Sequence, residues 1–185
     1  DSDGIKWLGC LYNGLGKFEG TIWTKCNTSN SGLNSNTISS MANDENGIKW
    51  IGTSGGGLTK LEGSAWTTFN KLNSDLASDY INEIVCDSHG NKWIATTAGL
   101  SKFDGTNWTT YSPYNSGIPG YDVTAIAIDA GGTKWIGTDH DGIAKFNGLT
   151  WTKYDKLNSG LPENYINSIA IDGNGVLWIG TTNGL

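Results

Sequence analysis

The chain has 185 residues, 37% of them hydrophobic, and a formal charge of −6 from 18 acidic residues against 12 lysines and no arginine. Scattered lysines on an acidic chain argue against binding to nucleic acid or to an anionic membrane surface. No apolar run approaches the roughly 18 residues of a membrane-spanning helix, so we expect no membrane insertion.

A repeat of roughly 43 residues organises the chain, and each copy begins with an aspartate. Four full repeats occupy residues 1–43, 44–86, 87–128 and 129–171, and a partial fifth occupies residues 172–185. A period of this length is typical of β-propellers and solenoids.

Each repeat contains four short runs rich in Ile, Trp, Tyr, Phe and Thr, which favour β-strands. The chain opens at a second strand, and the first strands of successive units are expected at residues 36–43, 79–86, 121–128 and 164–171. The other strands are exemplified by residues 143–146, 151–154 and 176–181. Four strands per repeat predict an all-β fold, a β-propeller of four-stranded antiparallel blades.

Turns of the form Asp-x-x-Gly separate the first and second strands. An aspartate side chain can accept hydrogen bonds from the turn backbone, and glycine takes positive φ without strain. Asp1–Gly4 and Asp172–Gly175 resemble the start of a calcium loop, but they lack the glutamate at the twelfth position. We therefore expect hairpin turns rather than bound cations, and no metal or cofactor.

Nine tryptophans form two series at fixed positions of the repeat. A glycine or alanine follows each tryptophan of the first series by two residues, on the same face of the strand, and leaves a hollow for a side chain of the adjacent blade. We therefore expect packing between blades rather than stacking on sugars. The first series is Trp7, Trp50, Trp93, Trp135 and Trp178, and the second is Trp23, Trp66, Trp108 and Trp151.

Three cysteines, Cys10, Cys26 and Cys86, stand at non-equivalent places in the repeats. An odd number without a regular spacing does not indicate a disulfide framework or a metal site. We expect free thiols that are buried or partly buried.

The loop after the second strand is the segment in which the repeats differ most, whereas the linker between blades is nearly constant. In a four-stranded blade these two connections emerge on the same face. Loops on a rigid scaffold commonly carry binding residues. The candidate ligand contacts are therefore Tyr12, Asp139, His140 and Asp141, with Tyr80, Tyr121 and Tyr165 behind them; the alternative is that they are solvated turn residues.

Catalysis finds little support in the sequence. His89 lies in a turn and His140 in a loop, without the partner spacing of a catalytic triad or a zinc site. No glycine-rich stretch has the context of a phosphate-binding loop.

The motifs KWIGTSGGGLTKLEG, KWIATTAGLSKFDG and KWIGTDHDGIAKFNG resemble the two-component regulator propeller repeat. The resemblance implies a secreted or periplasmic bacterial β-propeller. Such propellers serve as periplasmic sensors of hybrid histidine kinases, often responding to glycan fragments, or as secreted surface proteins. The family offers no fixed set of binding residues, so none is transferred to this chain.

The number of blades stays open at this point. Strand 164–171 could complete residues 1–26 and close a four-bladed ring, although residues 172–185 copy residues 1–15 and would then be surplus. Alternatively the chain is part of a larger propeller, which we favour, or its partial blades are completed by another copy. Unpaired strand edges favour association.

We therefore expect a non-catalytic propeller that binds a glycan, another ligand or another protein, outside the cytoplasm. The alternatives are a structural or adhesive array without a small ligand and, less favoured, a propeller-based polysaccharide lyase or hydrolase.

Overall fold

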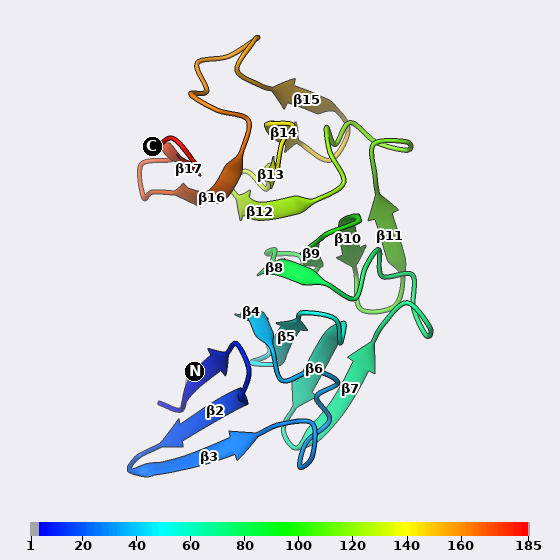
Figure 1. The fold of residues 1–185 in the computed structure, drawn as a ribbon, viewed down its shortest axis with the longest axis vertical. Coiled ribbons are helices and arrows are strands. Elements are labelled where there is room, and N and C mark those ends of the chain that lie inside the picture. The colour runs from blue at the N-terminus through cyan, green and yellow to red at the C-terminus, as the bar shows by residue number, and fades with distance from the viewer. Residues whose placement is uncertain (1–3, 185) are drawn as a thin grey trace.

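The computed structural model describes residues 4–184, which form five antiparallel sheets that follow one another along the chain (Figure 1). The first sheet contains β1 (Lys6–Cys10), β2 (Gly14–Glu19) and β3 (Ile22–Cys26). The second contains β4 (Ile38–Asn43), β5 (Lys49–Thr53), β6 (Leu58–Glu62) and β7 (Ala65–Phe69). The third contains β8 (Ile81–Cys86), β9 (Lys92–Thr96), β10 (Gly99–Phe103) and β11 (Trp108–Tyr111).

The fourth sheet contains β12 (Val123–Ile128), β13 (Lys134–Thr138), β14 (Ile143–Phe146) and β15 (Trp151–Tyr154), and the fifth contains β16 (Ile166–Ile171) and β17 (Leu177–Thr181). The three central sheets are complete four-stranded blades with their strands in sequence order. The predicted fold class, a β-propeller of four-stranded antiparallel blades, is confirmed.

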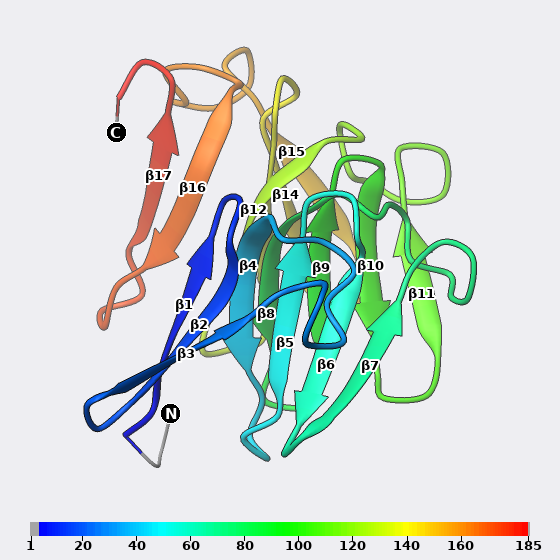
Figure 2. The ribbon, with the colours of Figure 1, turned by 60° about the horizontal axis from the view of Figure 1, so that its bottom comes forward.

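The blades are arranged as an open arc with the first strands β4, β8, β12 and β16 on the inner side (Figure 1). In the side view, the strands of successive blades stand next to one another (Figure 2). β16 pairs with β17 and not with β1. The alternative in which strand 164–171 completes the first blade and closes a four-bladed ring is therefore not the arrangement in this structure.

Each first strand begins two residues later than predicted, at Ile38, Ile81, Val123 and Ile166. The residues just before these strands bond to the loops of a neighbouring hairpin instead of to a strand. For example, the Ser54 N–H donates to the Thr37 carbonyl at 2.9 Å. The register of each first strand also shifts at its start, which marks a β-bulge.

Side chains of one first strand bond to the backbone of the next. The Ile84 N–H donates to Ser40 Oγ at 3.0 Å, and the Ile126 N–H donates to Glu83 Oε2 at 2.7 Å. Burial raises the pKa of Glu83 above its usual value of 4.5, and the bond from Ile126 opposes that change. These bonds join adjacent blades along the inner side of the arc.

The glycines that follow Trp7, Trp50 and Trp135 by two residues do receive a side chain of the next blade, as predicted, whereas Gly180 after Trp178 lies against Ser168 of its own sheet. A Cβ atom on Gly52 would lie 2.6 Å from Ile81 Cγ2, and one on Gly9 would lie 2.7 Å from Ile38 Cγ2. Gly137 has the same relationship to Ile166. The glycines are required because the isoleucine methyl groups fill the space of a side chain.

Packing of the tryptophans depends on their place in the arc. Trp50 and Trp93 are both only 2% exposed, and rings of the next blade cover them: Phe103 lies 5.8 Å from Trp50 and Phe146 lies 6.3 Å from Trp93. Trp7, Trp66, Trp108, Trp135 and Trp151 are partly buried.

The prediction of packing is wrong for Trp23 and Trp178, whose side chains are 62% and 51% exposed. Both lie in the terminal sheets of the arc, which have fewer than four strands. Trp66 is covered because the linker of the preceding blade places Gly32 directly against its indole. Among the described residues, Trp23 has no preceding linker to cover it in this way.

The aspartate turns are confirmed, and they make one contact that the sequence did not predict. Asp87 accepts hydrogen bonds from the backbone of His89 and Asn91 and also from the indole Nε1 of Trp93 at 2.9 Å. Lys134 of the next blade lies over the Trp93 ring, 4.8 Å from its centroid. Asp44 holds Trp50 in the same way, so these two turns each hold a tryptophan that the next blade covers.

The turn at Asp172–Gly175 has the same geometry, with a 3.0 Å bond from the Gly175 N–H to the Asp172 carbonyl. The proposed turn at Asp1–Gly4 lies largely outside the described residues.

Cys10, Cys26 and Cys86 are free and partly buried, as predicted. Burial, with Asp44 adding to it, raises the pKa of Cys86 to about 11.

Candidate functional site

One face of the arc, here named the loop face, carries the loops after the second strands together with the linkers between blades. Hydrogen bonds join the two kinds of segment: the N–H groups of Gly55 and Gly57 donate to the Asp79 carbonyl, both at 3.0 Å, and the Gly142 N–H donates to the Asn164 carbonyl at 3.0 Å. The expectation that these segments share a face is therefore confirmed.

A recurring contact on this face joins the loop of one blade to the residue that precedes the next first strand. Ser54 forms an isolated bridge with Tyr80, and a Cβ atom on Gly55 would lie 3.5 Å from the Tyr80 ring. Two blades further on, His140 meets Tyr165, with ring centroids 3.9 Å apart. The variable loop therefore determines what each of these tyrosines faces.

Asp139, His140 and Tyr165 form a continuous hydrogen-bonded series. His140 Nδ1 lies 2.8 Å from Asp139 Oδ2, and His140 Nε2 is hydrogen-bonded to the Tyr165 hydroxyl. Burial, with the charge of Asp139 adding to it, raises the pKa of Tyr165 above its usual value of 10.0. Tyr165 is thus held as a neutral phenol beside the imidazole.

Asp122 and Asn82 extend this cluster toward the inner side of the arc. The Asn82 amide donates to Asp122 Oδ1 at 2.9 Å and to the Val123 carbonyl at 2.8 Å, and the Asp139 N–H donates to the Asp122 carbonyl at 2.9 Å. Burial raises the pKa of Asp122, the bond from Asn82 opposes this, and the charge of Asp139 adds to it.

The remaining predicted contacts lie beside this cluster or apart from it. Asp141 lies against Gly120, where a Cβ atom would meet its carboxylate at 2.5 Å. Tyr121 pairs with Tyr114 at a centroid distance of 5.7 Å, and their hydrogen bond raises the pKa of Tyr121. Tyr12 is 81% exposed on the β1–β2 loop of the first sheet, and no contact joins it to the cluster.

Sequence reasoning missed Asn82, Asp122 and Tyr114. Asp122 directly follows a predicted tyrosine and could have been found from its position. Asn82 and Tyr114 gave no such signal, because Asn82 lies inside a first strand and Tyr114 occupies a linker position where two other linkers have leucine.

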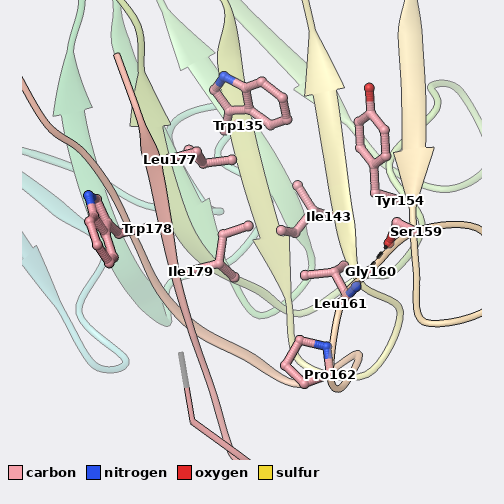
Figure 3. Close-up of a pocket in the computed structure, with 10 residues that line it drawn as sticks. All are labelled: Trp135, Ile143, Tyr154, Ser159, Gly160, Leu161, Pro162, Leu177, Trp178 and Ile179. Carbon is pink, nitrogen blue, oxygen red and sulfur yellow. Dashed lines mark hydrogen bonds between the residues drawn. The ribbon is translucent and has the colours of Figure 1, made fainter. Parts of the chain in front are cut away.

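A pocket of about 530 Å³ lies elsewhere, between β13–β15 and β17 (Figure 3). Its lining is mainly apolar and includes Trp135, Ile143, Leu161 and Leu177. At the two preceding blade boundaries, the equivalent place above the tryptophan holds Phe103 or Phe146. The pocket therefore lies where a phenylalanine of the following blade sits at those boundaries, and none of the predicted ligand contacts lines it.

Within residues 4–184, no group of three or more His, Cys, Asp and Glu side chains is arranged to hold a metal ion. The same residues include no helix that is long and apolar enough to cross a lipid bilayer.

Comparison with solved structures shows strong likeness to extracellular domains of putative two component systems. The extracellular domain of a putative hybrid two component system from B. thetaiotaomicron is 28% identical, with a TM-score of 0.88 over 100% of this chain and 26% of its own length. A second extracellular domain of this kind from the same organism is 23% identical, with a TM-score of 0.78 over 97% of this chain and 25% of its own length. The chain thus spans about a quarter of these domains.

A virginiamycin B lyase from Staphylococcus aureus shares the fold at 14% identity, with a TM-score of 0.73 over 100% of this chain and 65% of its own length. No curated protein sequence matches the chain. Residues 160–183 match the family model described as the two component regulator propeller, and related motifs recur in each preceding repeat. The resemblance drawn from the sequence is confirmed over residues 160–183, where the chain is similar to the two component regulator propeller.

Proposed function

We propose that this chain is a non-catalytic ligand-binding part of an extracellular or periplasmic propeller, in a bacterial sensor or surface protein, and that polar, sugar-like ligands bind on its loop face. The ligand contacts are Asp139, His140 and Tyr165, with Tyr121 at the start of the blade that carries His140 and Tyr80 at the start of the preceding blade. Tyr12 and Asp141 are proposed as peripheral contacts. The chain forms part of a larger propeller in this proposal.

One observation carries the proposal. His140 is 61% exposed at its side chain, yet it is bonded on both ring nitrogens, to Asp139 and to Tyr165 of the next blade. An exposed turn residue that is merely solvated has no need of such fixed partners. Aromatic and polar groups held in place at a rigid surface support the recognition of a ligand.

The sensor role is favoured by the 28% identity to an extracellular domain of a putative two component system. A structural or adhesive array is the second candidate, and the exposed linker residues Leu72 and Leu157, 95% and 89% exposed, favour it because they offer apolar contacts. The likeness to a lyase concerns the fold alone and supports no reaction here.

A glycan array probed with the 185-residue chain, followed by calorimetric titration of the hits, tests the proposal. We expect saturable binding that is weakened at least tenfold by Tyr165→Ala together with His140→Ala. His89→Ala is the matched control, because His89 lies in the β8–β9 turn on the opposite face. Absence of saturable binding would contradict the glycan-binding proposal. An equal loss of affinity in the double variant and in His89→Ala would also contradict it.

A further inference from the structure

Tyr165 and Tyr80 occupy equivalent positions before their first strands, but they face different chemistry. Tyr80 lies against Gly55, which has no side chain, whereas Tyr165 is bonded to an imidazole. Of the tyrosines predicted as ligand contacts, only Tyr165 therefore has its hydroxyl bonded to an imidazole, a side chain whose ring nitrogen can either accept or donate a hydrogen bond.

The direction of the hydrogen bonds follows from the donors and acceptors available. An ionised carboxylate only accepts hydrogen bonds, so His140 Nδ1, 2.8 Å from Asp139, must carry a proton. In the neutral imidazole the other nitrogen, Nε2, then has only a lone pair. Tyr165 must donate its hydroxyl hydrogen to Nε2, and only its oxygen lone pairs remain free.

Protonation of His140 reverses this arrangement. In the imidazolium ion both nitrogens are donors, so Nε2 donates to the Tyr165 oxygen. The hydroxyl hydrogen of Tyr165 must then rotate away and becomes available to another acceptor. The proton added to Nε2 comes from solvent, and no covalent bond other than N–H forms.

We propose that Asp139, His140 and Tyr165 form a protonation-sensitive relay in which His140 determines whether Tyr165 accepts or donates a hydrogen bond at the loop face. With neutral His140, Tyr165 selects ligand groups that donate, such as hydroxyl or amide N–H. With charged His140, it selects groups that accept, such as a carbonyl or carboxylate oxygen. This consequence for ligands rests on the proposed function, whereas the relay exists in the free protein.

The surroundings are consistent with a relay centred on His140. Asp122 is the other carboxylate near His140, whose charge acts to lower the pKa of Asp122, and Asp141 is the neighbour of His140 in the chain. On the linker before β16, Glu163 and Lys156 pair with each other at 3.5 Å. The imidazole ring is the member of this cluster that can present the same nitrogen, Nε2, either as an acceptor or as a donor to Tyr165.

Nuclear magnetic resonance of the isotopically labelled, ligand-free chain tests the relay. We expect neutral His140 to carry its proton on Nδ1, and the Tyr165 Cζ signal to shift with pH at the midpoint of the His140 ring. The Tyr80 Cζ signal should not follow that midpoint. His89, the only other histidine, provides an internal reference for an unrelated midpoint.

Substitutions make the test decisive. In His140→Ala and His140→Gln variants, the pH-dependent shift of Tyr165 Cζ near neutral pH should disappear, and in His89→Ala it should persist. A proton on Nε2 of neutral His140, a Tyr165 signal that does not change with pH, or a shift that survives in both His140 variants would overturn the proposal. Because no ligand is used, failure of the relay is distinguishable from failure of glycan binding.

Discussion

Ala95 and Val123 are fully buried in one cluster at the boundary between the third and fourth blades, at the place where the other boundaries bring a glycine against an isoleucine. Ala95 is larger than the glycine of the other boundaries, and Val123 is smaller than their isoleucine by a similar amount. The boundary thus keeps its volume, as close packing of interiors requires.

This relationship predicts that Gly52→Ala destabilises the chain, because the new methyl group would lie 2.6 Å from Ile81 Cγ2 and 3.0 Å from Ile84 Cδ1. Overpacking of this kind costs roughly 1–3 kcal/mol of unfolding free energy. Adding Ile81→Val should restore part of the loss, as in the Ala95–Val123 pair. Urea unfolding of Gly52→Ala and of the double variant, with Ile81→Val alone as the control, measures how far the two substitutions compensate. If their changes in unfolding free energy simply add, the prediction is contradicted.

The hydrogen bonds of Asp87 predict a specific acid sensitivity. Burial favours a higher pKa, but bonds from Trp93 and Asn91 prevail and hold the pKa of Asp87 below its usual value of 3.8. A lowered pKa in the folded state means that Asp87 stabilises the fold above pH 3.8 and that this contribution is lost as the pH falls through the folded-state value.

Asp87→Asn should therefore lower the free energy of unfolding at pH 7 by roughly 1–3 kcal/mol, since a charged acceptor of several bonds is replaced. The difference from the parent chain should shrink as the pH falls below 3.8. Thermal unfolding at a series of pH values tests this, and a difference that is the same at every pH would refute it.

Glu83 should show the opposite dependence on pH. Its pKa is raised in the folded state, so its contribution to stability is complete below its usual value of 4.5 and falls as the pH rises through the folded-state value. Glu83→Gln keeps an oxygen that can accept the Ile126 N–H and should remove this fall. Glu62→Gln, at an exposed position on β6, is the matched control.

Trp66 and Trp23 provide a matched pair for testing how the linker contributes. We expect Trp66→Ala to cost about 2–3 kcal/mol, less than the roughly 3–5 kcal/mol of a fully buried tryptophan, and Trp23→Ala to cost about 1 kcal/mol or less. The reason is that Gly32 covers Trp66 while Trp23 is 62% exposed. Equal losses in chemical denaturation would show that the linker contributes nothing.

The repeat period and the strand-forming runs were sufficient to predict the fold, because each run is short and bounded by glycine turns. The inter-blade hollow at Gly52 was also predictable, since the pleat alone places it beside Trp50. The exposure of Trp178 was not predictable. The same Trp-Ile-Gly-Thr motif is buried at Trp50 and exposed at Trp178, because its burial depends on the neighbouring blade. The sequence predicted His140 as a ligand contact. Its bonds to Asp139 and Tyr165 could not be predicted, because they depend on side-chain orientation.

The blade and the sequence repeat are out of phase by one strand, since the repeat at residues 44–86 contains β5, β6 and β7 and then the first strand of the following blade, β8. Gly52 and Ile81 therefore lie in one repeat although they belong to different blades, and so do His140 and Tyr165 in the repeat at residues 129–171. Duplication of one such genetic unit copies both halves of a blade boundary at once. A propeller that lengthens in this way gains a blade together with an interface that already fits, and in the repeats at residues 44–86 and 129–171 the loop is duplicated together with the tyrosine that it faces.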